Sequence, residues 1–296
     1  MRILLTGAKG QLGQELQPVL APLGEVIAAD RTVVDLANTA VLYDQVAELE
    51  PDVIVNAAAY TAVDKAENEG ALAQAVNGEA PGILGQVARD RQGFLFHVST
   101  DYVFNGSQGR PYRETDPTDP LGEYGRSKLA GAQAIAQPAP HHSAIIRTAW
   151  VYGTGGTGNF VKTMLRLGGD RPELRVVADQ IGSPTWNGDL AAAIAQLIPQ
   201  RSEDLAGTYH YTNSGAASWY DFAIAIFEEA KALGVDLAIE TVVPITTADY
   251  PTPAQRPSYS VLAGKKIAAK LGHPAPHWRQ GLRKMLTEYV PKLSSQ

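Results

Sequence analysis

Near its N-terminus the chain contains RILLTGAKGQLGQEL, residues 2–16, and this stretch decides the fold. Residues 2–6 are apolar enough to form a short buried strand, and residues 14–16 begin a helix. Between them Gly7, Gly10 and Gly13 form a Gly-x-x-Gly-x-x-Gly loop. Glycine lets the backbone turn tightly and approach a pyrophosphate, whose charge a helix N-terminus favours. An ordinary glycine-rich turn has a similar composition, but the order of strand, spaced glycines and helix favours nucleotide binding.

An acidic residue follows the second predicted strand, residues 25–29. Asp30 lies 23 positions after the first glycine of the loop, near the spacing expected of an acid that binds the adenosine ribose. Arg31 comes next, and a guanidinium there accepts a 2′-phosphate or is simply a solvated charge. The pair therefore leaves NADH and NADPH both open. Asp35 and Leu36 begin a stretch that flanks the adenine, unless Asp35 instead caps the helix that follows.

Strands and helices alternate through the first half of the chain. Apolar stretches at residues 53–56, 94–98 and 144–147 predict three more strands, and the longest helical stretch covers residues 71–91. This alternation predicts an α/β fold with a Rossmann-like, doubly wound parallel sheet. Ligands bind at the carboxyl ends of the strands in such sheets. Residues 57–61 (AAAYT) follow the third strand, and their small side chains leave room for a ligand, although tight helix–sheet packing also favours alanine.

The second half of the chain changes character. It contains short strands near residues 176–180 and 208–211, and helices near residues 188–198, 218–233, 264–271 and 278–290. We expect residues 1–150 to form mainly the dinucleotide-binding domain. We expect residues 151–296 to form mainly a smaller C-terminal α/β lobe that binds the substrate on the carboxyl edge of the sheet. The two parts are interleaved, because no stretch stands out as a clean linker.

A centre for proton transfer is predicted where the fourth strand ends. Ser99 and Thr100 lie at its carboxyl end, and Tyr124 and Lys128 are four residues apart, on one face of a predicted helix. An ammonium beside a phenol lowers a pKa that is normally about 10. Such a tyrosine can exchange a proton with a carbonyl or alcohol oxygen, which Thr100 is placed to hold. Tyr-x-x-x-Lys alone is a weak signal, but a bound dinucleotide supplies the hydride that side chains cannot carry.

Composition limits the classes of function. The chain has 296 residues, of which 45% are hydrophobic, a net charge of −6 and no cysteine. The acidic balance argues against nucleic acid as a partner, and the missing cysteines exclude disulfides and thiol nucleophiles. The N-terminus is a strand rather than a signal peptide, and no apolar run is long enough to span a bilayer. These features predict a cytoplasmic enzyme that does not bind membranes.

The combination resembles the extended short-chain dehydrogenase/reductase family, which has both the Gly-x-x-Gly-x-x-Gly loop and Tyr-x-x-x-Lys. Four further stretches are similar to a branch that acts on deoxysugar nucleotides: residues 55–67, 99–104, 147–152 and 250–257. The resemblance runs from end to end. It implies a dTDP-sugar substrate and reduction of the C4 keto group of dTDP-4-dehydro-L-rhamnose to dTDP-L-rhamnose, a precursor of cell-wall and surface glycans.

The resemblance also implies residue roles. Tyr124 would donate the proton, assisted by Lys128 and Thr100, and the sugar nucleotide would contact Thr100, Asp101 and Trp150. Trp150 has an alternative role as a core aromatic residue. To these we add Arg256 as a diphosphate ligand, because a planar guanidinium suits phosphate oxygens, although it could merely anchor its proline-rich loop. The expected cofactor contacts are Gly7, Gly10, Gln11, Leu12, Asp30, Arg31, Asp35, Leu36, Ala59, Tyr60, Thr61, Tyr124 and Lys128.

A metal site is implied by the resemblance alone. Some relatives form dimers through a magnesium ion held by glutamates. Glu15 and Glu288 match two of these positions, and Asp189 stands where those relatives carry the third glutamate. Because aspartate has a shorter reach, a homodimer joined by Mg²⁺ competes with the simpler interpretation that these acids are solvated.

Two other functions fit the same motifs. Sugar-nucleotide epimerases and dehydratases of this superfamily reuse their bound cofactor and often place a carboxylate base where Asp101 lies. A regulatory subunit of methionine adenosyltransferase also resembles this family, and it would bind NADP without reducing anything. Intact Thr100, Tyr124 and Lys128 argue against the regulatory role.

Overall fold

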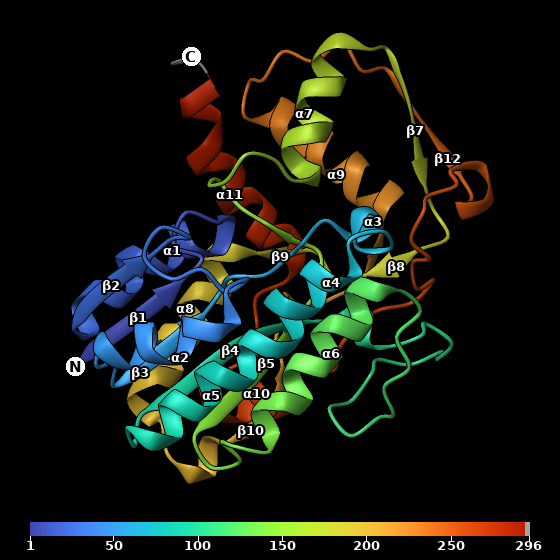
Figure 1. Cartoon of the computed structure of the whole chain (residues 1–296). Coiled ribbons are helices and arrows are strands. Elements are labelled where there is room, and N and C mark those ends of the chain that lie inside the picture. The colour runs from blue at the N-terminus through green and yellow to red at the C-terminus, as the bar shows by residue number, and fades with distance from the viewer. Residues whose placement is uncertain (294–296) are drawn as a thin grey trace.

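A parallel sheet of six strands forms the larger part of the computed structural model, which describes residues 1–293 (Figure 1). The strands lie in the order β10-β5-β4-β3-β1-β2, and every neighbouring pair is parallel. The predicted α/β fold with a doubly wound parallel sheet is therefore confirmed. The strands are β1 (Arg2–Thr6), β2 (Glu25–Ala29), β3 (Val53–Asn56), β4 (Phe94–Thr100), β5 (Ser143–Thr148) and β10 (Gly207–His210).

Helices cover both faces of this sheet. Successive side chains of a strand point to opposite faces, so each strand packs against helices on both sides. Ile3 and Val55 pack against one set of helices, whereas Leu4 and Ile54 pack against the other. Both faces are buried, so the strands have the nearly continuous apolar sequences of parallel sheets. The first set is α1 (Gln11–Leu20), α8 (Asn187–Leu197) and α10 (Lys265–Leu271), and the second is α2 (Thr39–Glu48), α5 (Ala80–Asp90) and α6 (Glu123–Ala136).

The sixth strand comes from the second half of the chain. From the sequence we expected residues 208–211 to belong to the smaller lobe, and this placement is wrong. β10 pairs in parallel with β5, with Thr208 opposite Ile145, and Tyr209 joins the main core. A strand's own sequence does not specify its partner, since that depends on where the connecting chain returns.

The helix predicted over residues 71–91 is continuous but not uniform. It consists of α4 (Gly70–Ala73), a π-helical turn (Gln74–Glu79) and α5. Asn77 lies in the π-helical turn and is buried. Single π-turns inside helices often occur at functional sites, and this one directs Asn77 toward the loop after β3.

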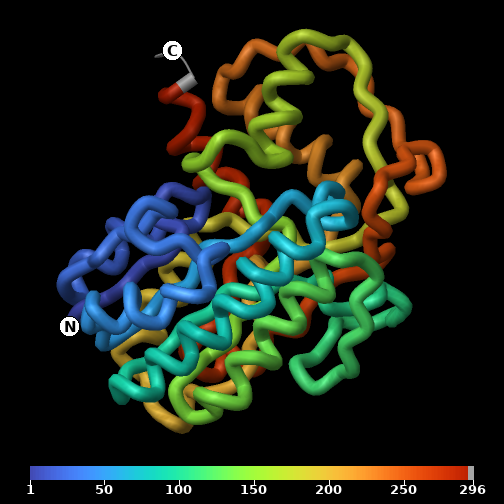
Figure 2. Tube along the Cα trace, viewed as in Figure 1, coloured from blue at the N-terminus to red at the C-terminus, as the bar shows by residue number. Residues whose placement is uncertain are grey.

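The smaller lobe has its own apolar core, in which Phe222, Leu282 and Met285 are fully buried. Figure 1 shows α7, α9, β7 and β12 together at one end of the molecule, and Figure 2 follows the chain between this lobe and the sheet. The lobe comprises α7 (Phe160–Asp170), β7 (Glu173–Val177), α9 (Trp219–Ala232), β12 (Thr241–Ile245) and α11 (Trp278–Leu293).

Short elements connect the two parts. The pairs β6 with β9 and β8 with β11 form two-stranded sheets of their own. These strands are β6 (Val151–Tyr152), β8 (Ile181–Gly182), β9 (Thr185–Trp186) and β11 (Ala217–Ser218). The other short elements of the chain are α3 (Val63–Ala66) and the 3₁₀ turns Ala21–Leu23, Asp101–Val103, Ile198–Gln200, Glu203–Leu205 and Thr247–Asp249. Within residues 1–293, no helix is both long and apolar enough to cross a membrane.

Substitution of Gly13 by Ala tests the packing of the glycine loop. A Cβ at Gly13 would overlap the carbonyl oxygen of Gly7 and lie 2.8 Å from the Cα of Ala8. We expect Gly13→Ala to lower the free energy of unfolding by about 1–3 kcal/mol in urea titrations, because backbone atoms must move. Gly169→Ala on α7 is the matched control, since no atom lies within 4 Å of its added Cβ and alanine favours the helix. Equal stability of the two variants would contradict this packing.

Candidate functional site

The loops after β1 and β3 diverge where the strand order reverses. The chain passes from β1 to β2 on one side and then to β3 on the other side of β1. Gly7 occupies this point with a φ of 71°, and a Cβ there would lie 2.7 Å from the backbone N and Cα of Ala58. Only glycine therefore permits the two loops to meet. In doubly wound sheets this reversal is where nucleotides bind.

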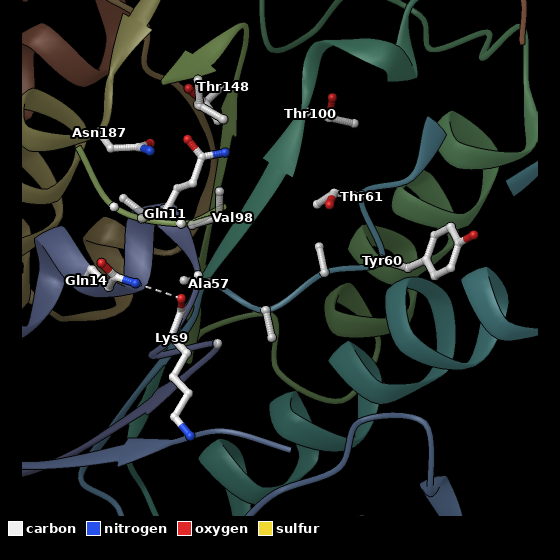
Figure 3. A pocket seen from close by; sticks show the side chains of 18 of the residues that line it. Lys9, Gln11, Gln14, Ala57, Tyr60, Thr61, Val98, Thr100, Thr148 and Asn187 are labelled. Carbon is white, nitrogen blue, oxygen red and sulfur yellow. Dashed lines mark hydrogen bonds between the residues drawn. The ribbon is translucent and has the colours of Figure 1, made fainter. Parts of the chain in front are cut away.

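A cavity of about 1170 Å³ opens along the carboxyl edge of the sheet. Figure 3 shows that Gln11 and Lys9 from the first loop and Ala57, Tyr60 and Thr61 from the loop after β3 contribute to its wall. Every predicted cofactor contact lines this one cavity, as do three of the four predicted substrate contacts: Thr100, Asp101 and Trp150.

At one end of the cavity Asp30 is held as a carboxylate. Lys9 forms an ion pair with it, and the backbone N and hydroxyl of Thr32 donate to it at 2.8 and 2.6 Å. These bonds, that of Lys9 foremost, hold the pKa of Asp30 well below its usual value. Asp35 does not cap α2. Its carboxylate accepts from the backbone N of Ala37 at 3.0 Å, which shapes the loop that lines the cavity.

The loop after β3 is fixed by Asn77, whose role in the site could not be seen in the sequence. Its amide accepts from the backbone N of Tyr60 at 2.9 Å and donates to the carbonyl of Tyr60 at 3.0 Å and to the hydroxyl of Ser127 at 3.1 Å. The hydroxyl of Tyr60 donates to Glu69 at 2.7 Å, and this bond raises the pKa of Tyr60 to about 12. The wall of the cavity is thus rigid before any ligand binds.

Thr100 and Tyr124 lie on the same side of the cavity as Tyr60, against whose apolar cluster Tyr124 packs. Thr100 ends β4 and Tyr124 is the second residue of α6, and the Thr100 hydroxyl lies close enough to the phenol to oppose the rise of its pKa. The expected lowering of the tyrosine pKa is wrong for this structure. Although Tyr124 as a residue is only partly buried, protein surrounds its hydroxyl, and this burial raises its pKa. Tyr124 therefore keeps its proton at neutral pH, which is the state a proton donor needs.

Lys128 lines the cavity, and its ammonium group is bound at the end of β4. Its Nζ donates to the carbonyl of Val98 at 2.7 Å and is 3.5 Å from Nε2 of His97. Burial lowers the pKa of Lys128 to about 7. His97 is fully buried, as expected, with Nδ1 3.0 Å from the amide nitrogen of Asn56. Contacts with Val98 of β4 and Asn56 of β3 therefore hold Lys128 and His97 in place.

Asp101 is an acid buried next to this centre. It is 2% exposed, and the hydroxyl of Thr100 donates to it at 3.0 Å. Burial raises the pKa of Asp101 to about 6, although hydrogen bonds from Ser260 and Thr100 oppose the shift. A carboxyl group with this pKa is ionised in most molecules at pH 7.

Trp150 is held in a strained position just past β5. Its φ is 48°, which is rare for a bulky residue, and its indole stacks on that of Trp219 with ring centroids 3.5 Å apart. A side chain at Gly182 would overlap the ring from another direction. Trp219 and Gly182 lie far from Trp150 in the sequence, so no local pattern could have predicted this stack.

Arg256 lies outside the group of residues that line the cavity. Its guanidinium pairs with Asp64 at 2.9 Å and donates to the hydroxyl of Tyr102 at 3.3 Å. The structure thus gives it the anchoring contacts considered above, and its role as a diphosphate ligand stays a prediction.

The three acids predicted to hold magnesium are not gathered. The carboxylate of Asp189 accepts from Asn213 at 2.7 Å and pairs with Lys284 at 3.2 Å. Glu15 accepts from the hydroxyl of Thr154 at 3.1 Å, and burial together with Glu15 raises the pKa of Glu288. Within residues 1–293, no three acidic or histidine side chains lie close enough to hold a metal ion. The pairing of Asp189 with Asn213 and Lys284 explains why its carboxylate does not lie with Glu15 and Glu288.

Fold and cavity together are those of a dinucleotide-binding α/β protein, with Thr100 and Tyr124 on the wall of the cavity. Residues 1–290 match the model of the family described as RmlD substrate binding domain, and the chain belongs to this family. It is 44% identical to the dTDP-4-dehydrorhamnose reductase of Escherichia coli K12 over 97% of this chain and 98% of that protein. It is 46% identical to the Streptomyces griseus protein of the same name, over 99% and 94% of the two chains.

Solved structures agree with this family. A dTDP-4-dehydrorhamnose reductase from Clostridium acetobutylicum is 38% identical, with a TM-score of 0.89 over 99% of this chain and 100% of that one. The reductase from Bacillus anthracis, solved in complex with NADP, is 38% identical with a TM-score of 0.89 over 97% and 99%. A UDP-glucose 4-epimerase from Thermus thermophilus, 21% identical with a TM-score of 0.79 over 98% and 99%, shares the fold.

Replacing the buried lysine tests the electrostatics of the site. The pKa of Lys128 is near 7 in the folded chain but 10.5 when unperturbed, so between these values the unfolded chain binds more protons. The stability of the wild type relative to Lys128→Met should therefore rise from pH 7 to pH 10.5, by up to about 1.4 kcal/mol per pH unit. Urea titrations across this range measure the difference. Lys265→Met, at an exposed position, controls for loss of a lysine, and a flat difference for Lys128→Met would contradict the assignment.

Proposed function

We propose that this chain uses NADPH or NADH to reduce the C4 keto group of dTDP-4-dehydro-L-rhamnose to dTDP-L-rhamnose. The observation that carries the proposal is the meeting of the glycine loop with Thr100, Tyr124 and Lys128 in one cavity. The names of relatives at 44% and 46% identity, which match nearly the whole chain, support the choice of substrate.

The residues present fit a dinucleotide. A side chain at Gly7 would fill the space where the backbone turns. Gly10 is the N-cap residue of α1, and no side chain caps this end of the helix. Its free N–H groups and the helix dipole suit a pyrophosphate. Asp30 would bind the adenosine ribose, and Lys128 the nicotinamide ribose. The bound dinucleotide would supply hydride to the C4 carbon of the sugar.

Acceptance of both cofactors follows from charges near Asp30. A carboxylate accepts from the 2′-hydroxyl of NADH but repels the 2′-phosphate of NADPH. Here Lys9 neutralises Asp30, and Arg31 lines the same part of the cavity. The relative solved with NADP is consistent with this reasoning.

The chain's own groups would handle the proton. Tyr124 keeps its proton because burial raises its pKa, and it would pass this proton to the C4 oxygen as the carbonyl becomes an alcohol. Thr100, whose hydroxyl lies close to the phenol, would hold the same oxygen. Residues 1–150 would bind mainly the cofactor and residues 151–296 mainly the sugar nucleotide, with Trp150 at the junction.

Asp101 supports the second candidate function, sugar-nucleotide epimerisation or dehydration. A buried carboxyl with a pKa of about 6, bonded to Thr100, is suited to act as a base. A coupled assay separates the two functions: dTDP-4-dehydrorhamnose is generated in situ, NADH or NADPH is supplied separately, and oxidation of the cofactor is followed by its absorbance. Stoichiometric oxidation supports reduction, interconversion of nucleotide sugars without oxidation supports the alternative, and binding without turnover contradicts both.

Loss of the phenol should remove catalysis but not cofactor binding. We expect Tyr124→Phe to lower kcat by about 10²–10⁴-fold, the usual contribution of a general acid, while the Kd for NADPH stays within about twofold. Tyr43→Phe is the matched control, because its hydroxyl bonds to Asp90 on the helices far from the cavity. Full reductase activity in Tyr124→Phe would exclude the phenol as the proton donor.

A further inference from the structure

Three neutral polar side chains that line the cavity lack hydrogen-bond partners within residues 1–293: Ser99, Thr148 and Asn187. Asn187 is fully buried, and neither its amide oxygen nor its amide nitrogen is bonded. Thr148 is 6% exposed, and its hydroxyl is also unpaired. An unpaired buried polar group costs about 1–3 kcal/mol, so native proteins contain few of them. Both residues line the main cavity, which suggests that a ligand satisfies them.

Their position is between the glycine loop and the proton-transfer centre. Thr148 ends β5 directly opposite Thr100 of β4, and Asn187 opens α8. Figure 3 shows Thr148 and Asn187 on either side of the Gln11 side chain, which belongs to the glycine loop. Gly153 leaves room for the amide, because an added Cβ would lie 3.1 Å from its nitrogen. A group bound here would lie near the reacting end of the cofactor.

The donor and acceptor groups of the Asn187 amide determine which ligand groups can pair with it. Asn187 offers one donor group and one acceptor, so a partner that only accepts would leave its oxygen unpaired. A pyrophosphate at neutral pH only accepts. A carboxamide both donates and accepts, and the nicotinamide ring carries one.

We propose that Asn187, together with the hydroxyl of Thr148, binds the carboxamide of the nicotinamide ring. This inference rests on the proposed function, since it requires a nicotinamide cofactor. A carboxamide held on both of its polar atoms stops the ring from rotating about its bond to the ribose. Asn187 thereby fixes which face of the ring is turned toward the oxygen held by Thr100 and Tyr124.

Three ligands and two variants test the contact. NADP⁺ carries the carboxamide, its 3-acetylpyridine analogue replaces the amide nitrogen with a methyl group, and 2′-phospho-ADP-ribose lacks the ring. Calorimetry should show that the wild type prefers NADP⁺ to the analogue by about tenfold, the effect of one or two hydrogen bonds. Asn187→Ala should lose most of this preference and should bind 2′-phospho-ADP-ribose as the wild type does. Thr148→Val should weaken NADP⁺ binding less, by about threefold.

The stability of the ligand-free variants distinguishes a binding role from a structural one. The side-chain amide of Asn187 has no hydrogen-bond partner among the residues that the structure describes, so Asn187→Ala should keep or raise the Tm measured without cofactor. Asn213 is the matched control, because it is equally buried but bonded to Trp186 at 2.8 Å and Asp189 at 2.7 Å. Asn213→Ala should lower the Tm by several degrees and should keep the preference for NADP⁺ over the analogue.

Three results would overturn the inference. If Asn187→Ala weakens binding of 2′-phospho-ADP-ribose as much as that of NADP⁺, the side chain contacts the pyrophosphate or supports the whole site. If the preference for NADP⁺ over the analogue survives in Asn187→Ala, the carboxamide binds elsewhere while the proposed function stands. If the wild type binds neither NADP⁺ nor NADPH, the proposed function fails as well.

Discussion

The structure depends on a close approach of two backbones at Gly7. The loops after β1 and β3 meet there, and an added Cβ would lie 2.7 Å from the backbone of Ala58. This contact places the N-terminus of α1 beside the loop that Asn77 holds rigid. The floor and one wall of the cavity follow from it. The parallel register sets Thr148 beside Thr100 at the carboxyl ends of β5 and β4, and both residues line the cavity.

Burial controls the chemistry of the groups on that edge. It raises the pKa of Tyr124, so the phenol stays protonated, and it lowers the pKa of Lys128 to about 7. Asp101 and the unpaired Asn187 add further polar burial in the same place. Each of these features costs stability, and the extensive apolar core on both faces of the sheet offsets that cost. Polar groups buried in one cavity, rather than scattered through the core, are expected where a ligand completes them.

The sequence predicts those parts of the site that depend on local order. Spaced glycines after a strand, an acid after the next strand and Thr100 after the fourth all reach the cavity, because parallel strands end at a common edge. The clamp of Asn77 on Tyr60 and the stack of Trp150 on Trp219 depend on contacts between distant segments, which no spacing encodes. Burial shifts the pKa of Tyr124 opposite to the expected direction, because the helical spacing of Tyr124 and Lys128 does not reveal how deeply the phenol is buried.

In the proposed reaction, hydride passes to C4 of the sugar while Tyr124 supplies the proton. Isotope transfer tests it most directly: NADPH carrying deuterium at the transferable position of its nicotinamide is mixed with dTDP-4-dehydrorhamnose, and the sugar product is examined by mass spectrometry and proton NMR. The account predicts dTDP-rhamnose with a single deuterium at C4, one per NADPH oxidised. A product without deuterium, or an isomerised sugar formed with no loss of NADPH, would contradict it.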